Sequence, residues 1–267
     1  MKTITLAIAM LLASSFAWSQ SSRQFPTNSA LEPSEELTVF PHVTMGNGWK
    51  TSFVLFNVSD FAVTYRLVFY GNDGHAADIK LKDRDASSEV FGTLQPRASV
   101  RLETEADEGA TSETQYWAAL EEGSGPIAAV QTFEWNGPNG QKTSATVPIS
   151  DDFTVDPIYV PFDNMNGSRT ALVITNTDNL TTPEAHTIVI EGWDSDGNQF
   201  FSTTRSIESG DKPAFLLGDE YPELANQTGV IRLYAEDSGI GDFAILALQA
   251  DEDGNIAAVL PFEGYFF

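Results

Sequence analysis

The chain contains no cysteine among its 267 residues, so no disulfide can stabilise it and its stability must come from buried apolar area. Cations are also scarce: 14 Lys and Arg face 38 Asp and Glu, which gives a net charge of −24. Nucleic acids and anionic membranes are bound through clusters of Lys and Arg, so the sequence argues against both as partners. The acidic residues are scattered, which is typical of a solvated surface, with divalent-cation sites as the alternative.

Residues for acid–base or nucleophilic catalysis are equally few. The only histidines are His42, His75 and His186, and none lies in a metal-binding pair such as H-E-x-x-H. No G-x-S-x-G motif occurs, because the segment 123–125 precedes Pro126 and is better interpreted as a loop. The sequence therefore predicts a non-enzymatic protein. A secreted carbohydrate-active enzyme stays open as the alternative, since glycoside hydrolysis needs only a pair of carboxylates.

The only long apolar run lies at the start of the chain. Lys2 precedes the run Thr5–Phe16, and Ala17-Trp18-Ser19 supplies the small residues of a cleavage site. We interpret residues 1–19 as a signal peptide because the run is shorter than the roughly 20 residues of a membrane span. We expect a secreted or periplasmic protein without membrane insertion. Residues 20–38, rich in Ser, Pro and Glu, are predicted to form a disordered lead-in.

No helical periodicity is sustained, and short β-forming runs separated by turn residues fill the remainder. In Val63–Phe69 and Asp78–Lys82 apolar and polar side chains alternate, which is typical of strands with one face on a core. Asp73-Gly74 between them predicts a hairpin turn. Seven such runs before residue 150 and seven after it predict an all-β protein built from antiparallel sandwiches.

One stretch of the chain is repeated. Residues 40–57 read FPHVTMGNGWKTSFVLFN, and a degenerate copy, VPFDNMNGSRTALVITN, occupies residues 160–176. Both contain a proline, a loop with Asn and Gly, a Thr-led apolar run and a closing Asn. A repeat of more than 100 residues exceeds the 20–50 residues of solenoids and indicates a duplicated domain. We therefore predict two sandwich domains, at residues 39–152 and 153–267.

The first copy also carries a recognisable motif. F-P-H at residues 40–42 is followed by G-x-G-W-x-T at residues 46–51 and later by an aromatic-x-x-D-G turn. This pattern resembles a repeat of secreted proteins of environmental bacteria, an Ig-like β-sandwich that usually occurs in tandem and has no assigned activity. The resemblance implies two tandem Ig-like antiparallel β-sandwich domains. Because the second copy departs from the pattern at His42 and Trp49, we expect both residues to serve packing first.

Two acidic turns are candidate calcium sites. Alternating carboxylates around a glycine present oxygen ligands to Ca²⁺ in short loops. An EF-hand also needs a Glu six residues after its glycine, where this chain has Thr203 and Leu260. A plain hairpin turn, in which Gly supplies a positive φ, explains the glycine positions by itself and is the favoured interpretation over Ca²⁺; no other cofactor is expected. The candidate ligands are Asp194, Asp196, Asn198, Asp251, Asp253 and Asn255.

Aromatic residues at strand ends are candidate ligand-binding residues. Trp135 and Trp193 each end a predicted strand beside a turn, so we expect them to be exposed, whereas Trp117 lies within an apolar run and is expected to be buried. The predicted function is that of a non-catalytic binding or structural module of the cell exterior or periplasm. Because exposed Trp side chains stack on sugar rings, carbohydrate binding or adhesion is the specific candidate within it, with a polysaccharide or another surface protein as partner. The alternative is that both Trp residues plug the ends of the sandwiches.

Overall fold

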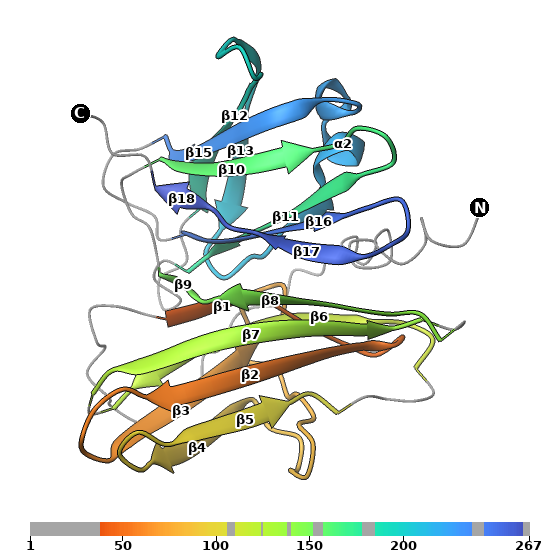
Figure 1. Ribbon diagram of the computed structural model, residues 1–267. Helices are drawn as coiled ribbons and strands as arrows, with labels where there is room; N and C mark the ends of the chain where they lie inside the picture. Colours follow the sequence, from red (N-terminus) through yellow and green to blue (C-terminus); the bar gives the residue numbers. More distant parts are fainter. Residues whose placement is uncertain are drawn as a thin grey trace. The chain divides into compact units, whose positions relative to one another are not determined.

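The computed structural model describes residues 38–105, 110–123, 125–137, 140–151, 157–177, 185–236 and 243–263 (Figure 1). The predicted signal peptide and nearly all of the predicted lead-in lie outside these ranges. The described residues form two compact units, one up to residue 151 and one from residue 157 onward. Among the described residues no helix is long and apolar enough to cross a membrane.

The first unit is made of nine strands in two antiparallel sheets. One sheet has the order β4-β3-β6-β1-β9 and the other β5-β2-β7-β8. Side chains from both sheets share one core, in which Phe40 and Leu67 of one sheet meet Phe53 and Leu55 of the other. The strands are β1 (Thr38–Met45), β2 (Trp49–Asn57), β3 (Val63–Tyr70), β4 (Glu89–Leu94), β5 (Ser99–Glu103), β6 (Thr114–Glu122), β7 (Ile127–Asn136), β8 (Lys142–Pro148) and β9 (Ser150–Asp151).

The second unit repeats this arrangement. Its sheets have the orders β13-β12-β15-β10-β18 and β14-β11-β16-β17, so every strand takes the place of the strand numbered nine lower. Ile188 and Leu233 of one sheet face Leu172 and Phe243 of the other. The elements are β10 (Ile158–Asp163), β11 (Arg169–Asn176), β12 (Ala185–Trp193), β13 (Gln199–Glu208), β14 (Ala214–Leu216), α2 (Leu217–Glu220), η1 (Pro222–Leu224), β15 (Thr228–Ala235), β16 (Phe243–Ala250), β17 (Ile256–Val259) and β18 (Phe262–Glu263).

The protein is therefore all-β, as the sequence predicts, with open antiparallel sheets facing one another in each unit (Figure 1). The strand order differs from that of an immunoglobulin constant domain, in which the first two strands belong to one sheet. Here β1 and β2 lie in different sheets, and so do β10 and β11.

The chain passes from one sheet to the other within the repeated stretch, between β1 and β2 and between β10 and β11. In both copies Asn and Gly adopt positive φ, 48° and 85° at Asn47 and Gly48 and 52° and 85° at Asn166 and Gly167. Asn-Gly is the preferred sequence for such a turn. Beyond the turn the two flanking strands enter different sheets and no longer form main-chain hydrogen bonds with each other. A threonine hydroxyl of the second strand bonds to the main chain of the first instead. Thr170 Oγ1 donates to the Asp163 carbonyl at 3.2 Å and accepts from the Asp163 N–H at 3.0 Å.

The first copy has the same bridge at 2.8 and 3.0 Å between Thr51 Oγ1 and the carbonyl and N–H of Thr44. The closing asparagine ties the other end of the strand to the opposite sheet. Asn57 Nδ2 donates to the Leu94 carbonyl at 3.1 Å, and Asn176 Nδ2 donates to the Ile207 carbonyl at 2.9 Å. The threonine and the asparagine that both copies of the repeat share thus link the two sheets of each unit.

The two units close their cores differently. In the first unit the segment 77–82, predicted from its alternation to be a strand, forms only isolated bridges, at Ile79 and Leu81. Both side chains are buried in the core, which explains the alternation without a continuous ladder. In the second unit α2 and η1 insert Leu217 and Leu224 instead.

Candidate functional site

Trp135 is buried, so the expectation that it is exposed is wrong. It lies directly opposite Trp49 on the neighbouring strand, their ring centroids are 6.2 Å apart, and only 8% of Trp135 is exposed. Trp49 lies at the start of β2 and Trp135 near the end of β7, so the two indoles pack together at one end of the first sandwich. Trp49 and His42 are also buried, in line with the packing roles expected of them.

Trp193 is half-buried on the outward face of the sheet β13-β12-β15-β10-β18. Its indole Nε1 is shielded from solvent and has no hydrogen-bond partner among the described residues. The part of the ring that solvent reaches is therefore carbon surface. Such a surface is suited to stacking on an apolar ring face rather than to donating a hydrogen bond.

Other aromatic side chains share this outward face. Tyr159 lies opposite Phe262, and their rings stack with centroids 5.5 Å apart and an interplanar angle of 13°. Phe262 is 51% exposed. Tyr234 projects from β15, the strand between those of Trp193 and Tyr159. We call these four residues, Trp193, Tyr234, Tyr159 and Phe262, the aromatic face.

A charged pair lies in the middle of the aromatic face. Arg232 Nη1 donates to Glu191 Oε2 at 3.1 Å, and the Tyr234 hydroxyl donates to Glu191 Oε1 at 3.2 Å. The guanidinium carbon also lies 4.5 Å from the centroid of the Tyr234 ring. Desolvation, followed by the negative charge of Glu191, raises the pKa of Tyr234 above 10.0, so its hydroxyl stays protonated at neutral pH.

Strand geometry places these groups in one row. Glu191 pairs with Arg232, Arg232 pairs with Tyr159, and Tyr159 pairs with Phe262. Neighbouring strands are about 4.8 Å apart, so the row extends over roughly 15 Å. Trp193 lies one step further along β12, opposite Val230. The face thus combines flat apolar rings with hydrogen-bonding groups that are already paired with one another.

The same positions of the first unit carry different side chains. Val68, Ala119, Val39 and Ser150 replace Glu191, Arg232, Tyr159 and Phe262, as the strand pairing shows. Tyr70, which takes the place of Trp193, stacks on Trp117 at 4.2 Å, and Trp117 is 0% exposed. Its burial is as expected from the sequence, and burial also raises the pKa of Tyr70 to about 12. The scaffold alone therefore does not require the partly exposed aromatic side chains of the second unit.

The comparisons with known proteins give no further guide. No family model, no curated protein and no solved structure matches this chain.

The two acidic turns are hairpin turns of one design. Asp194 Oδ1 accepts the N–H groups of Asp196 at 2.9 Å and of Asn198 at 2.8 Å. Asp251 Oδ1 accepts those of Asp253 and Asn255 at 3.0 and 2.8 Å. Gly197 and Gly254 have φ of 81° and 80°, as the third loop position of such hairpins requires.

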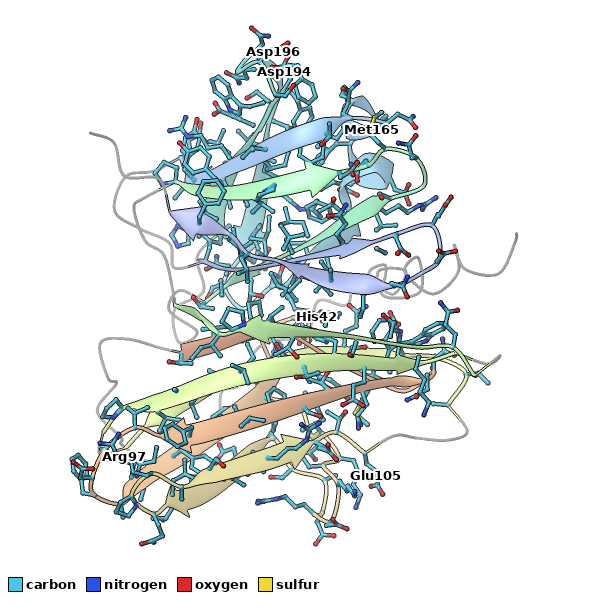
Figure 2. The ribbon with its side chains drawn as sticks, in the orientation of Figure 1. His42, Arg97, Glu105, Met165, Asp194 and Asp196 are labelled. Carbon is cyan, nitrogen blue, oxygen red and sulfur yellow. The ribbon has the colours of Figure 1, made fainter. Side chains whose placement is uncertain are left out.

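These hydrogen bonds lower the pKa of both aspartates below 3.8; the Asn198 backbone N–H is the largest cause for Asp194, and the Asn255 side chain for Asp251. Figure 2 shows Asp194 and Asp196 at the outer end of the hairpin that joins β12 and β13. Among the described residues no three acidic or histidine side chains gather closely enough to hold a metal ion. The turns account for the D-x-D-G-N pattern by themselves, and calcium binding stays a prediction.

The second unit also has a small cavity of about 230 Å³ beside the Asn166-Gly167 turn. Its carboxylate, Asp219, lies 3.4 Å from Arg169. Two carboxylates on opposite sides of a sugar are what hydrolysis requires, and this cavity offers one that is already paired. Nothing in its lining supports the enzymatic alternative.

Sequence reasoning found Trp193 but missed its neighbours. Tyr159 lies between Pro157 and Pro161, and Phe262 directly follows Pro261, so neither lies in a run with an obvious strand pattern. Arg232 and Tyr234 are separated by one residue in β15, and this alternation was the available signal that both face outward.

Proposed function

We propose that this protein is an exported, non-catalytic binding module of the cell exterior or periplasm, and that its second domain binds a polysaccharide at the aromatic face. Export rests on the predicted signal peptide, residues 1–19. Each domain is taken as Ig-like in the broad sense of two facing antiparallel sheets. The observation that carries the binding proposal is a difference between the units. Tyr159 and Phe262 form a stacked, partly exposed pair where the first unit has Val39 and Ser150. Trp193 lies on the same face, whereas its counterpart Tyr70 stacks on the buried Trp117.

The chemistry of the face favours a sugar over other ligands. Trp193 presents carbon surface, and Tyr159 with Phe262 presents a second flat apolar area two strands away. Sugar rings have apolar faces that stack on such side chains and hydroxyls that hydrogen-bond to groups like Arg232, Glu191 and the Tyr234 hydroxyl. On the described part of this face the cation is Arg232, which is paired with Glu191, so an anionic ligand would compete with that carboxylate.

The net negative charge of the chain favours neutral over acidic polysaccharides as ligands. The chain has a net charge of −24, and removal of the predicted signal peptide with Lys2 makes it one unit more negative. An acidic polysaccharide would be repelled at low ionic strength. We therefore expect neutral polysaccharides to bind and polyuronates not to bind.

Affinity electrophoresis of the mature full-length chain tests the proposal, with soluble neutral glucans, xylans and mannans in the gel and alginate as the acidic comparison. We expect Trp193→Ala and Tyr159→Ala each to weaken retention on the neutral polymer about 3- to 10-fold, the equivalent of one lost aromatic contact. Phe91→Ala is the matched control, because Phe91 is an aromatic of the first unit that is 62% exposed.

The possible outcomes of this experiment separate binding at the aromatic face from the alternatives. Retention that falls in the two variants of the aromatic face and not in Phe91→Ala supports the proposal. Absence of retention on every polymer, with the thermal transition intact, contradicts it and favours a protein partner at the same face. Equal losses in all three variants contradict it as well, since the effect would then not belong to the aromatic face.

A further inference from the structure

Among the described strands that lie at sheet edges, the longest is β13, at the edge of the sheet that carries the aromatic face. β13 has ten residues, Gln199–Glu208, and pairs only with β12. The other described strands at sheet edges have between two and seven residues. A long edge with unpaired main-chain groups is a template for another strand.

The hydrogen-bond pattern shows which groups of β13 are unpaired. The Glu236 N–H donates to the Thr187 carbonyl at 2.8 Å, so the main chain of Thr187 is turned toward β15. Its neighbour on the other side is Ser206 of β13. Because main-chain direction alternates along a strand, the N–H and C=O groups of Ser206, Thr204 and Ser202 point away from β12. In the described part of the chain no other strand pairs with them.

On other strands, main-chain groups that lack a ladder partner are capped by a side chain or removed by proline. In the first unit the Ser87 hydroxyl donates to the Glu89 carbonyl at 2.9 Å and accepts the Glu89 N–H at 3.2 Å, which caps both main-chain groups of Glu89 at the start of β4. On β10, Pro161 has no N–H, and the hydroxyl of Thr170 caps both groups of Asp163.

β13 has no proline, and no capping side chain is among its described contacts. Its sequence from Gln199 to Glu208 has no proline, and its one cation, Arg205, lies on the inward side, where it pairs with Glu220 at 2.7 Å. The side chains beside the unpaired groups are the small hydroxyls of Ser202, Thr204 and Ser206, all exposed. Natural edges usually carry Lys or Pro at such positions, so this one is open for pairing.

We propose that β13 is a dimerisation edge, on which a second copy of this chain pairs antiparallel through its own β13. The strand is self-complementary about Thr204: Ser202 comes opposite Ser206 of the second copy, and Thr204 comes opposite Thr204. Hydroxyl pairs of this kind stabilise antiparallel strands. Arg205 comes opposite Thr203 and Glu208 opposite Phe200, so no like charges face one another across the two-fold axis.

Such a dimer joins two five-stranded sheets into one sheet of ten strands. Side chains that are opposite in a ladder share a face, so both aromatic faces lie on the same side of the joined sheet. A polymer with repeated sites would then bind two copies at once, with higher avidity than one copy. The dimer itself does not depend on what the aromatic face binds.

Sedimentation velocity of the mature full-length chain tests the proposal, from about 10 μM to 1 mM protein, the range expected for a small interface. We expect a monomer–dimer equilibrium that tightens when NaCl is raised from 0.05 to 0.5 M, because salt screens the repulsion between two chains of net charge −24. Thr204→Pro removes one edge N–H, and Thr204→Lys adds a charge at the two-fold axis; both are expected to weaken dimerisation at least 10-fold.

Thr93→Pro is the matched control, because Thr93 lies on β4, the equivalent edge strand of the first unit. It is expected to leave the equilibrium unchanged. Slower amide exchange at Ser202, Thr204 and Ser206 in concentrated samples is the second readout. A chain that stays monomeric at 1 mM in 0.5 M NaCl, or a dimer that both Thr204 variants leave intact, overturns the proposal.

Discussion

Where the repeated stretch passes from one sheet to the other, a threonine side chain makes hydrogen bonds that a neighbouring strand would otherwise make. The hydroxyl of Thr170 is bonded to both main-chain groups of Asp163, and the residue is fully buried. Thr51 repeats this bridge in the first unit. The threonine that both copies share is therefore explained by two hydrogen bonds, which no other side chain of the same shape could make.

Thr170→Val is expected to lower the free energy of unfolding of the second unit by about 1–3 kcal/mol. Valine has the same shape but leaves the N–H and C=O of Asp163 unpaired. Thr170→Ser keeps the hydroxyl and is expected to lose less than half as much. Urea denaturation of the full chain checks this. Equal losses in the two variants would show that the methyl group, and not the hydroxyl, is what matters.

The sequence predicted residue roles well where local chemistry decides them. The D-x-D-G-N turns and the burial of Trp117 follow from turn preferences and apolar context, and the packing roles of His42 and Trp49 follow from comparison of the two copies of the repeat. Trp135 was assigned wrongly because exposure at a strand end depends on the partner strand. Its burial comes from Trp49, 86 positions away in sequence, and no local pattern reports that contact.

Among the elements, the helical insertion α2–η1 closes the core of the second unit. It lies between β14 and β15 and contributes Leu217 and Leu224, both fully buried. The first unit uses Ile79 and Leu81 of a different loop for the same purpose. The two solutions show that the sandwich requires apolar side chains at its open edge but not a particular backbone.

Leu224→Ala is expected to lower the free energy of unfolding by about 2–5 kcal/mol, the usual cost of a cavity in a packed core. Leu260→Ala is the control, since Leu260 is 58% exposed and its loss leaves no cavity. Chemical denaturation of both variants measures the difference. A change below 1 kcal/mol in Leu224→Ala would mean that the insertion is peripheral to the core.

Strand content followed from the sequence better than strand order. The alternating runs correspond to strands in most cases, but β1 and β10 are predicted only as parts of the repeated stretch and are not among the predicted strands. Both contain a proline, which is tolerated because β1 and β10 are covered on one side only by the two-residue strands β9 and β18. Which strands share a sheet is decided by contacts distant in sequence, such as the pairing of Val39 with Ala119.

The whole molecule combines a duplicated scaffold with a large excess of negative charge. Two units with the same strand order have diverged on their outward faces, so that one carries the aromatic face and the other does not. The net charge of −24 acts on both, because repulsion among like charges disfavours any compact state. Salt should therefore affect stability through screening, independently of any bound ion.

Raising NaCl from 0.02 to 0.3 M is expected to increase the melting temperature, by about 2–4 °C for each kcal/mol of repulsion removed. CaCl₂ at the same ionic strength separates screening from binding at the acidic turns. Ca²⁺ bound there adds stability that grows as the logarithm of its concentration above the dissociation constant. Asp194→Asn combined with Asp251→Asn removes one carboxylate from each turn and should abolish only that added part. If CaCl₂ and NaCl raise the melting temperature equally, the D-x-D-G-N segments act as turns and the excess charge acts only through repulsion.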